Sequence, residues 1–371
     1  MHKLTAFSTV LEHELSELRL LVERQTGIVL DCPNSVLAAH VVAYIEAEDL
    51  ESSAALLESL RSPDRDPSRL LALLDGVINT NSGFFRHPGA LNALTRHIMP
   101  QLCARKSADG PSPLRIWSAG CGSGEETYSI AMAVCDALSR NVASVGTNGN
   151  GSGTNGNGKA AARRGGIAES PSVASSTGSN AALSNTGLSS IGSSIHIVGS
   201  DLLPCNIAVA DRGVYRQSAL DGLPPATIRN YFSKISSPRL VSNAQPETEL
   251  ELTEESRQAV CGDSESPASN AHLLVKPRLR SLVTFNCMNL ARPGYIGRFD
   301  CIFCMDVLPH FSRAQRIALL ERLHLYLEPG GYLFLSQTEK LTTSNLNFRS
   351  ETFDGYTFHR KPLAASAAYG R

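Results

Sequence analysis

The spacing of hydrophobic residues changes once along the chain, near residue 76. Before this point apolar side chains recur every three or four positions, which is typical of amphipathic helices. The first such helix presents one apolar stripe, made of Leu11, Leu15, Leu18 and Val22. Thr9 and Glu12 fit a capping box at its start, and Gly27 fits a C-terminal stop. The pattern predicts an all-helical domain over residues 1–76.

Short, continuous apolar runs separated by helical stretches follow from about residue 77 onward. Runs at 114–119, 195–201 and 299–304 predict buried strands, and a last run at 332–336 follows a glycine-rich turn. Strands that alternate with helical stretches indicate βαβ units. The pattern therefore predicts an α/β domain after the helical one.

Two polar stretches interrupt the α/β pattern. Residues 144–194 are almost entirely Gly, Ser, Asn, Thr and Ala and hold 11 of the 29 glycines, so they cannot bury enough apolar area to offset their ordering entropy. Residues 246–267 carry seven acidic residues against a single Arg257. We expect the first stretch to be a flexible surface insertion without an active-site role, and the second to be a solvated acidic loop.

The composition narrows the classes of function. Of 371 residues, 42% are apolar and 19% are charged, which is typical of a soluble globular protein of about two domains. The net charge of −1 provides no basic field for nucleic acid, and no apolar run approaches the roughly 20 residues of a membrane span. The N-terminus also lacks the apolar centre of a signal peptide. We expect a cytoplasmic protein that neither binds nucleic acid nor inserts into a membrane.

Nine cysteines, an odd number, are scattered along the chain and predict free thiols rather than a disulfide framework. The one close pair, Cys301 and Cys304, lies in a predicted buried strand. A zinc site would need a second pair or a turn beside it. The sequence therefore predicts no metal.

A glycine-rich turn joins the first predicted strand to the helix after it. Gly120, Gly122 and Gly124 stand at alternate positions, where the backbone must turn sharply and let a ligand approach without a Cβ in the way. Taken alone, such a turn fits NAD, FAD, S-adenosylmethionine or a purely structural role.

Acidic residues near this turn distinguish among the ligands. Glu125 and Glu126 put negative charge at a helix start, where a pyrophosphate would need a positive field. S-adenosylmethionine carries no phosphate and has a sulfonium cation, so it suits an acidic loop better. Asp201, at the end of the second strand, can accept both ribose hydroxyls of an adenosine cofactor, although a turn- or helix-capping role is also open.

Eight segments in order resemble the chemotaxis-receptor glutamate O-methyltransferases of the CheR type, over nearly the full ordered length of the chain. The segments are N-S-G-F-F-R-H-P at 81–88, W-S-A-G-C-G-S-G-E-E-T-Y-S at 117–129, G-V-Y at 213–215, L-D-G-L-P-P at 220–225, N-Y-F at 230–232, M-N-L at 288–290, F-D-C-I-F-C at 299–304 and L-E-P-G-G-Y-L-F-L at 327–335. The resemblance implies a doubly wound S-adenosylmethionine-dependent methyltransferase sheet, an N-terminal all-helical domain and a small inserted antiparallel β subdomain. The expected limits are 1–76 for the helical domain, 77–362 for the methyltransferase domain, 233–285 for the β subdomain and 363–371 for a tail.

The same resemblance implies the site residues. Ser82 and Arg86 would approach the methionine end of the cofactor, and Glu126 would meet its amino or sulfonium side. The full set expected to bind the cofactor is Thr80, Ser82, Arg86, Gly120, Gly122, Gly124, Glu126, Asp201, Asn289, Leu290 and Cys304, the last three at the adenine. Arg86 and His310 are the expected catalytic residues.

The chain departs from the family pattern at three neighbouring site positions. The family usually reads C-R-N-V-x-I-Y-F where this chain reads Cys304 to Phe311, so Met305 replaces an Arg and Asp306 replaces an Asn. His310 stands where the family places a Tyr; a protonated His310 could still hydrogen-bond an acceptor carboxylate, whereas Asp306 would repel one. The second predicted helix contains no Arg or Lys, so its electrostatic fit to an acidic receptor would be lost.

The sequence predicts a monomeric enzyme that transfers a methyl group from S-adenosylmethionine to glutamate carboxylates of chemoreceptor-type proteins. The products would be glutamate methyl esters and S-adenosylhomocysteine. Two alternatives stay open. One is a signalling adaptor with a methyltransferase fold and little or no turnover, motivated by the altered Met305, Asp306 and His310. The other is a methyltransferase with a small-molecule acceptor, motivated by the helix without basic residues.

Overall fold

The structure is a computed structural model, which describes residues 10–62, 66–78, 82–109, 112–146, 195–235, 271–294, 297–341 and 346–363. The acidic loop expected at 246–267 lies outside the described residues, as does the expected insertion beyond residue 146. Thr80 and Thr9 also lie outside them.

Four helices make up the described part of the first 76 residues. They are α1 (Glu12–Thr26), α2 (Asn34–Ala47), α3 (Ser53–Arg61) and α4 (Pro67–Asp75). Their buried leucines, valines and isoleucines form one continuous apolar cluster with a face of the central sheet. The all-helical prediction is confirmed for these residues, while the domain boundary at residue 76 stays a prediction.

Helix α1 ends where the sequence predicts and begins differently. Gly27 adopts φ +77° and its N–H donates to the Glu23 carbonyl, which ends the helix in a left-handed cap. At the start, the N-cap is Leu11, whose N–H donates to Glu14 Oε2 at 2.9 Å. Leu11 is 50% exposed, so its predicted place in the buried stripe is wrong. It precedes the first helical turn and therefore does not share the helix's inner face.

A seven-stranded sheet forms the centre of the α/β part, in the order β6-β2-β1-β7-β8-β10-β9. Its strands are β1 (Leu114–Ala119), β2 (Ile195–Asp201), β6 (Val283–Cys287), β7 (Phe299–Cys304), β8 (Leu327–Leu335), β9 (Arg349–Phe353) and β10 (Tyr356–Arg360). Strands β6, β2, β1, β7 and β8 are parallel, and β10 and β9 are antiparallel to their neighbours. The chain leaves β1 toward β2 on one side and later leaves β7, the other neighbour of β1, toward β8 on the opposite side, so the loops after β1 and β7 diverge and leave a crevice.

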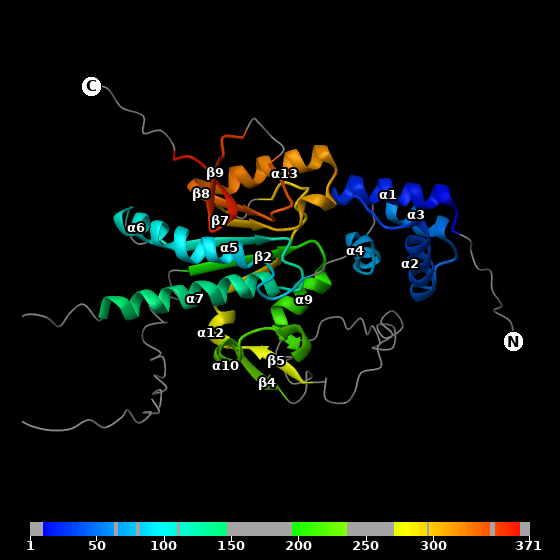
Figure 1. Ribbon diagram of the computed structural model, residues 1–371. Coiled ribbons are helices and arrows are strands. Elements are labelled where there is room, and N and C mark those ends of the chain that lie inside the picture. Colours follow the sequence, from blue (N-terminus) through cyan, green and yellow to red (C-terminus); the bar gives the residue numbers. More distant parts are fainter. Residues whose placement is uncertain are drawn as a thin grey trace, which may run out of the picture.

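Helices cover both faces of this sheet, as the continuous apolar strands require. One face is covered by α5 (Pro88–Asn92), the π-helical turn η1 (Ala93–Ile98), α6 (Met99–Asp109) and α7 (Glu125–Gly146). The other is covered by α13 (Arg313–Tyr326), and the four N-terminal helices lie at one end of that layer (Figure 1). The predicted doubly wound α/β architecture is thus confirmed, with an antiparallel pair added at one edge.

A second, three-stranded antiparallel sheet has the order β3-β5-β4. Its strands are β3 (Val214–Arg216), β4 (Phe232–Ile235) and β5 (His272–Val275), accompanied by α9 (Pro204–Arg212), η2 (Gln217–Leu220), α10 (Pro225–Tyr231) and α12 (Pro277–Arg280). The small sheet expected within 233–285 is present. It also includes β3, from before that range, whereas β6, which begins at residue 283, pairs with β2 in the large sheet.

The hairpin of β9 and β10 is an element that the apolar runs do not predict. Asp354 (φ +49°) and Gly355 (φ +76°) form its two-residue turn, since both central positions need a left-handed backbone. An Asp-Gly pair between alternating strands is a strong hairpin signal. The hairpin extends the sheet beyond the last predicted strand.

Gly124 joins the glycine turn to α7 and packs against α9. It adopts φ +95°, and a Cβ there would lie 2.7 Å from Ala210 Cβ and 3.0 Å from Ala210 Cα. We expect Gly124→Ala to lower the free energy of unfolding by about 3 kcal/mol, because backbone strain and overpacking add. Gly355→Ala is the matched control, with φ +76° and nothing within 4 Å, and should cost only about 1 kcal/mol of strain. Urea denaturation measures both; equal losses would show that the contact with α9 contributes nothing.

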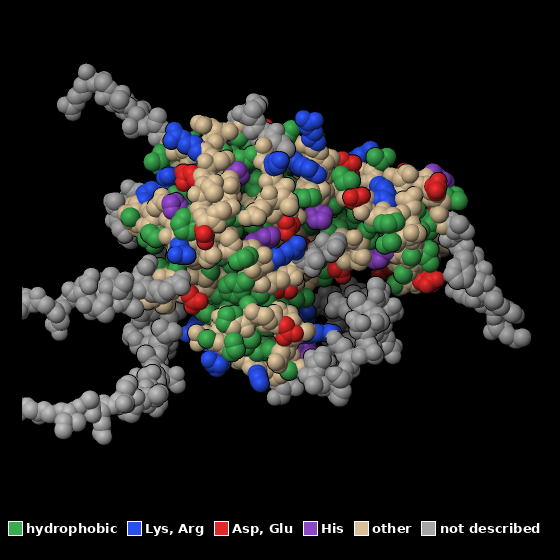
Figure 2. All heavy atoms as spheres, in the orientation of Figure 1, with side chains coloured by type: hydrophobic (Ala, Val, Ile, Leu, Met, Phe, Trp, Pro, Cys, Tyr) green, Lys and Arg blue, Asp and Glu red, His purple; other side chains and the backbone are tan. Residues whose placement is uncertain are grey.

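The distribution of surface charge and the state of the cysteines agree with what the composition predicts. Basic and acidic side chains are mixed over the face in Figure 2, in keeping with a net charge of −1. The cysteines in the described ranges are free thiols, and Cys301 and Cys304 are fully buried in β7. Within those ranges, no helix has the length and apolar character needed to cross a membrane.

Candidate active site

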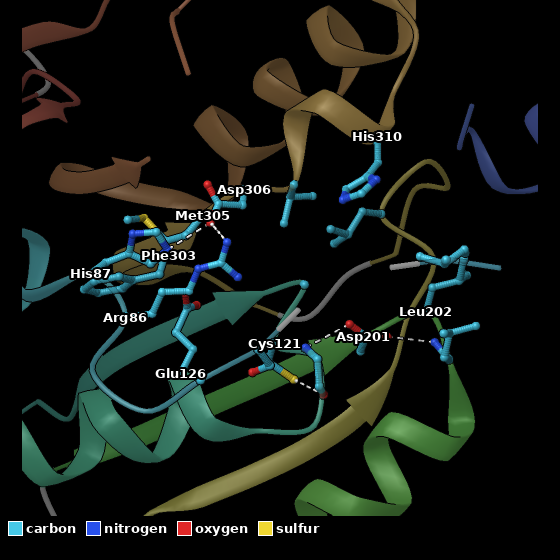
Figure 3. Close-up of a pocket in the computed structure, with 18 of the residues that line it drawn as sticks. Arg86, His87, Cys121, Glu126, Asp201, Leu202, Phe303, Met305, Asp306 and His310 are labelled. Atoms are coloured by element: carbon cyan, nitrogen blue, oxygen red, sulfur yellow. Dashed lines mark hydrogen bonds and ion pairs between the residues drawn. The ribbon is translucent and has the colours of Figure 1, made fainter. Parts of the chain in front are cut away.

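A cavity of about 340 Å³ lies at the carboxyl ends of β1, β2 and β7 and beside the loop after β6 (Figure 3). The loop before α5 supplies a further wall. Thr26 and Ile28, at the end of α1, and Ile78, after α4, line another side. Ligands of open α/β sheets bind in the crevice outside the carboxyl ends of the strands. The cavity is therefore the candidate active site.

At the glycine turn, the backbone passes close to β2 and to the loop that carries Val307. Gly120 (φ +80°) and Gly122 (φ +55°) are left-handed, and the Gly120 N–H donates to the Ser200 carbonyl of β2 at 2.8 Å. A Cβ on Gly120 would collide with Val307 Cγ2. Both positions thus need glycine, which leaves the cavity floor as bare backbone.

Asp201 ends β2 and is only 7% exposed. Its Oδ2 accepts from the Gly122 N–H at 3.0 Å, and its Oδ1 accepts from the Leu203 N–H at 2.9 Å and from Asn206 Nδ2 at 3.0 Å. A carboxylate accepts about four hydrogen bonds. Asp201 is thus fixed in place and keeps capacity for a donor from the cavity that it lines.

Arg86 lies across the cavity between Glu126 and Asp306 (Figure 3). Its Nη2 is 3.1 Å from Asp306 Oδ2, and the same oxygen is 3.1 Å from His87 Nε2. Burial lowers the pKa of His87 despite the attraction of Asp306, so the ring is neutral at pH 7. Asp306 is therefore held by one cation and one neutral N–H donor.

Glu126, on the first turn of α7, also lines the cavity. Burial raises the pKa of Glu126 to about 7, against the hydrogen bond from Ser118 and with further repulsion from Asp306 and Glu339. The Ser118 hydroxyl donates to Glu126 Oε1 at 2.7 Å. At neutral pH this carboxyl group is close to half ionised, and a cation in the cavity would favour its charged form.

His310 enters the same cavity from a different wall (Figure 3). It ends the short helix η4 (Leu308–His310), and its carbonyl accepts from the Val29 N–H at 2.8 Å. Burial lowers the pKa of His310 below 6.5, against the attraction of Asp306 and Asp201. The protonated His310 considered from the sequence is therefore disfavoured at pH 7, where the neutral ring donates one hydrogen bond.

Sequence comparison relates the chain that forms this cavity to a known family. The family model "CheR methyltransferase, SAM binding domain" matches residues 80–149 and 242–356. Chemotaxis protein methyltransferase 1 of Pseudomonas aeruginosa is 26% identical over 326 residues, which is 87% of this chain and 88% of that protein. The chain belongs to the CheR methyltransferase family. A chemotaxis protein methyltransferase of Vibrio parahaemolyticus, another relative, is 24% identical over 90% of this chain and 91% of its own length.

Among solved structures, the magnesium protoporphyrin IX methyltransferase of Synechocystis overlaps 74% of this CheR-family chain and 78% of its own chain. The identity is 13% and the TM-score is 0.27, a likeness too small to bear on the fold.

Most of the residues that the CheR resemblance implies meet at the one cavity. Those that line it are Ser82, Arg86, Gly120, Gly122, Glu126, Asp201, Asn289, Leu290 and His310. Gly124 packs on α9, and Cys304 is fully buried in the sheet, so neither lines the cavity. The Asn289 side chain donates to the Gln25 carbonyl at 3.0 Å and accepts from the Ala291 N–H, so its amide is already tied to the end of α1.

The CheR cavity also contains residues that sequence reasoning missed. Thr26, the last residue of α1, and Ile28, just after the helix, both line it, and Ile28 forms an isolated bridge with Phe311. His87 neighbours Arg86 and shares Asp306 with it. The H-P pair at 87–88 precedes a helix and was the available signal for His87, whereas nothing local marks Thr26 or Ile28.

Proposed function

We propose that this chain transfers the methyl group of S-adenosylmethionine to glutamate side-chain carboxylates of chemotaxis-type receptor proteins, giving methyl esters and S-adenosylhomocysteine. The proposal includes a cytoplasmic, monomeric enzyme that needs no metal. The observation that carries it is a single cavity with Asp201 on one wall and Arg86 and Glu126 on another, in a chain of the CheR family.

The groups that line the cavity fit the proposed cofactor. Asp201 has capacity for a ribose hydroxyl, and the bare backbone of Gly120 and Gly122 leaves space beside it. Glu126 would face the amino or sulfonium cation, because a carboxyl group with a pKa of about 7 ionises readily beside positive charge. Asn289 and Leu290 would border the adenine, beside Ile28 of the N-terminal part.

Methyl transfer requires that the acceptor carboxylate be positioned. It does not require that a proton be removed from it. A glutamate side chain, with an unperturbed pKa of about 4.3, is already ionised at neutral pH. When bound, S-adenosylmethionine would supply the electrophilic methyl group. Arg86 would hold the acceptor oxygen in line with that methyl group, at a separation of about 3 to 3.5 Å. Neutral His310 would donate one hydrogen bond to the same carboxylate.

The test is methyl transfer by the full chain. Purified protein, methyl-labelled S-adenosylmethionine and a receptor cytoplasmic fragment are expected to give labelled receptor, and mild base should release the label as methanol. Label that stays on the protein in base would indicate an acceptor other than a carboxylate. Transfer to no receptor fragment would contradict the proposal.

The Asp306–Arg86 pair favours a second candidate, a cofactor- or receptor-binding adaptor with little or no turnover. Asp306 puts a negative charge where an acidic acceptor would enter. Calorimetry and the labelling assay together separate the two candidates. An adaptor would bind S-adenosylhomocysteine or a receptor fragment yet transfer no label, whereas the enzyme would do both.

A further inference from the structure

Asp306 has an unusual backbone conformation, and hydrogen bonds to Glu339 hold it in place. It adopts φ +58°, a left-handed conformation that few residues other than glycine accept, although Asp and Asn tolerate it best. The Glu339 carboxylate accepts from the N–H groups of Asp306 at 3.2 Å, Leu308 at 2.9 Å and Ser336 at 2.8 Å. These three hydrogen bonds tie the loop after β7 to the end of β8, so the direction of the Asp306 side chain is built into the fold.

The loop that carries Arg86 is fixed in a similar way. Phe85 adopts φ +53°, and its N–H donates to Ser129 Oγ at 2.9 Å. Ser129 in turn donates to the Glu125 carbonyl at 2.6 Å. Phe85 is neither Asn nor Asp, so its left-handed backbone stores strain of the kind found at functional sites. Two constrained loops therefore hold Asp306 and Arg86 against one another.

The contact lies where the cavity meets solvent. The side chains of Arg86, Asp306 and His87 are 43%, 35% and 23% exposed. A partly exposed ion pair is weak because water screens it. An incoming carboxylate can therefore replace Asp306 on the guanidinium, and breaking the ion pair makes its binding free energy less favourable.

We propose that Asp306 occupies the position on Arg86 that the acceptor carboxylate must take, and so sets the affinity of the site for acidic acceptors. The inference rests on the proposed function, since it assigns the Arg86 guanidinium to the acceptor. The acceptor must displace Asp306 from the guanidinium before it can bind there. This competition weakens binding of carboxylates and spares neutral ligands.

Asp306→Asn tests the proposal because it keeps the size and the tolerance for a left-handed backbone while it removes the charge. The probe is propionate, the carboxylate of a glutamate side chain without its backbone, titrated by NMR into the complex with S-adenosylhomocysteine. The dissociation constant is expected to fall about fivefold, the value of a partly exposed ion pair. Asp354→Asn is the matched control: it changes an exposed left-handed aspartate outside the cavity and should leave propionate binding unchanged.

A double-mutant cycle makes the test specific for Arg86. In an Arg86→Ala background, Asp306→Asn should no longer change propionate binding. Unchanged binding in the single variant would overturn the proposal, as would a gain that persists without Arg86, which would indicate a general charge effect.

Methyl transfer separates failure of this inference from failure of the proposed function. If propionate binding follows the expectation but no methyl ester forms, the inference stands and the proposed function fails. If receptor is methylated while Asp306→Asn leaves both the KM for receptor and propionate binding unchanged, the proposed function stands and the inference fails.

Discussion

Replacing Arg86 by alanine is expected to lower the turnover of methyl transfer by about 10²- to 10³-fold, the usual loss when one charged or polar group that orients the reacting atoms is removed. Arg86 is the cation whose guanidinium reaches Asp306 across the cavity. Without it, the carboxylates of Asp306, Asp201 and Glu126 would face an acidic acceptor with less positive charge to offset them.

The fold should survive this substitution. The Arg86 side chain is 43% exposed, and a partly exposed ion pair adds less than about 1 kcal/mol to stability. The melting temperature should therefore move by only a few degrees. Arg349→Ala, on the exposed edge strand β9, is the matched loss of an arginine outside the cavity and should keep full turnover. Turnover of Arg86→Ala equal to that of the wild type would exclude the assigned role.

Arg86→Lys separates charge from geometry. Lysine keeps the positive charge and loses the planar fork that matches a carboxylate. If alignment of the acceptor oxygen is what Arg86 supplies, the lysine variant should remain well below wild-type turnover while it binds S-adenosylhomocysteine normally. Steady-state kinetics and calorimetry on the same samples provide both values.

Local sequence patterns predict the parallel strands because burial on both faces leaves uninterrupted apolar runs. Strands β1, β2 and β7 appear at their predicted positions, and Asp201 lies at the cavity as expected. The glycines between β1 and α7 were also predictable, because a tight turn that packs against another segment leaves no room for a side chain. These features depend on neighbours in the sequence.

The unpredicted features depend on contacts between distant segments. Thr26 and Ile28 reach the cavity because the chain after α1 pairs with Phe311, nearly 300 residues later. Asp306 faces Arg86 because Glu339 fixes a left-handed backbone at that position. The hairpin of β9 and β10 is a different case, because its Asp354-Gly355 turn is a local signal that apolar runs alone do not detect.

Lowering the pH from 8 to 6 is expected to weaken binding of S-adenosylhomocysteine about tenfold, with Glu126 as the main cause. The pKa of Glu126 is about 7 because burial disfavours its charge. The ligand's amino group stays protonated over this range and favours ionised Glu126, so binding removes a proton from this carboxyl group. A group with a pKa of 7 is about 90% ionised at pH 8 and about 10% ionised at pH 6. Affinity should thus be constant above pH 8 and fall below pH 7.

Glu126→Gln identifies the group responsible. The variant cannot ionise, so it should bind the ligand more weakly at pH 8 and lose most of the pH dependence. His87 and His310 also line the cavity and gain protons on acidification, but burial keeps the pKa of each below 6.5, so their effect begins at lower pH than that of Glu126. Calorimetric titrations at pH 8, 7 and 6 measure the effect in both proteins. If the variant keeps the wild-type slope, the histidines rather than Glu126 control the affinity, and the cation of the ligand does not lie beside this carboxylate.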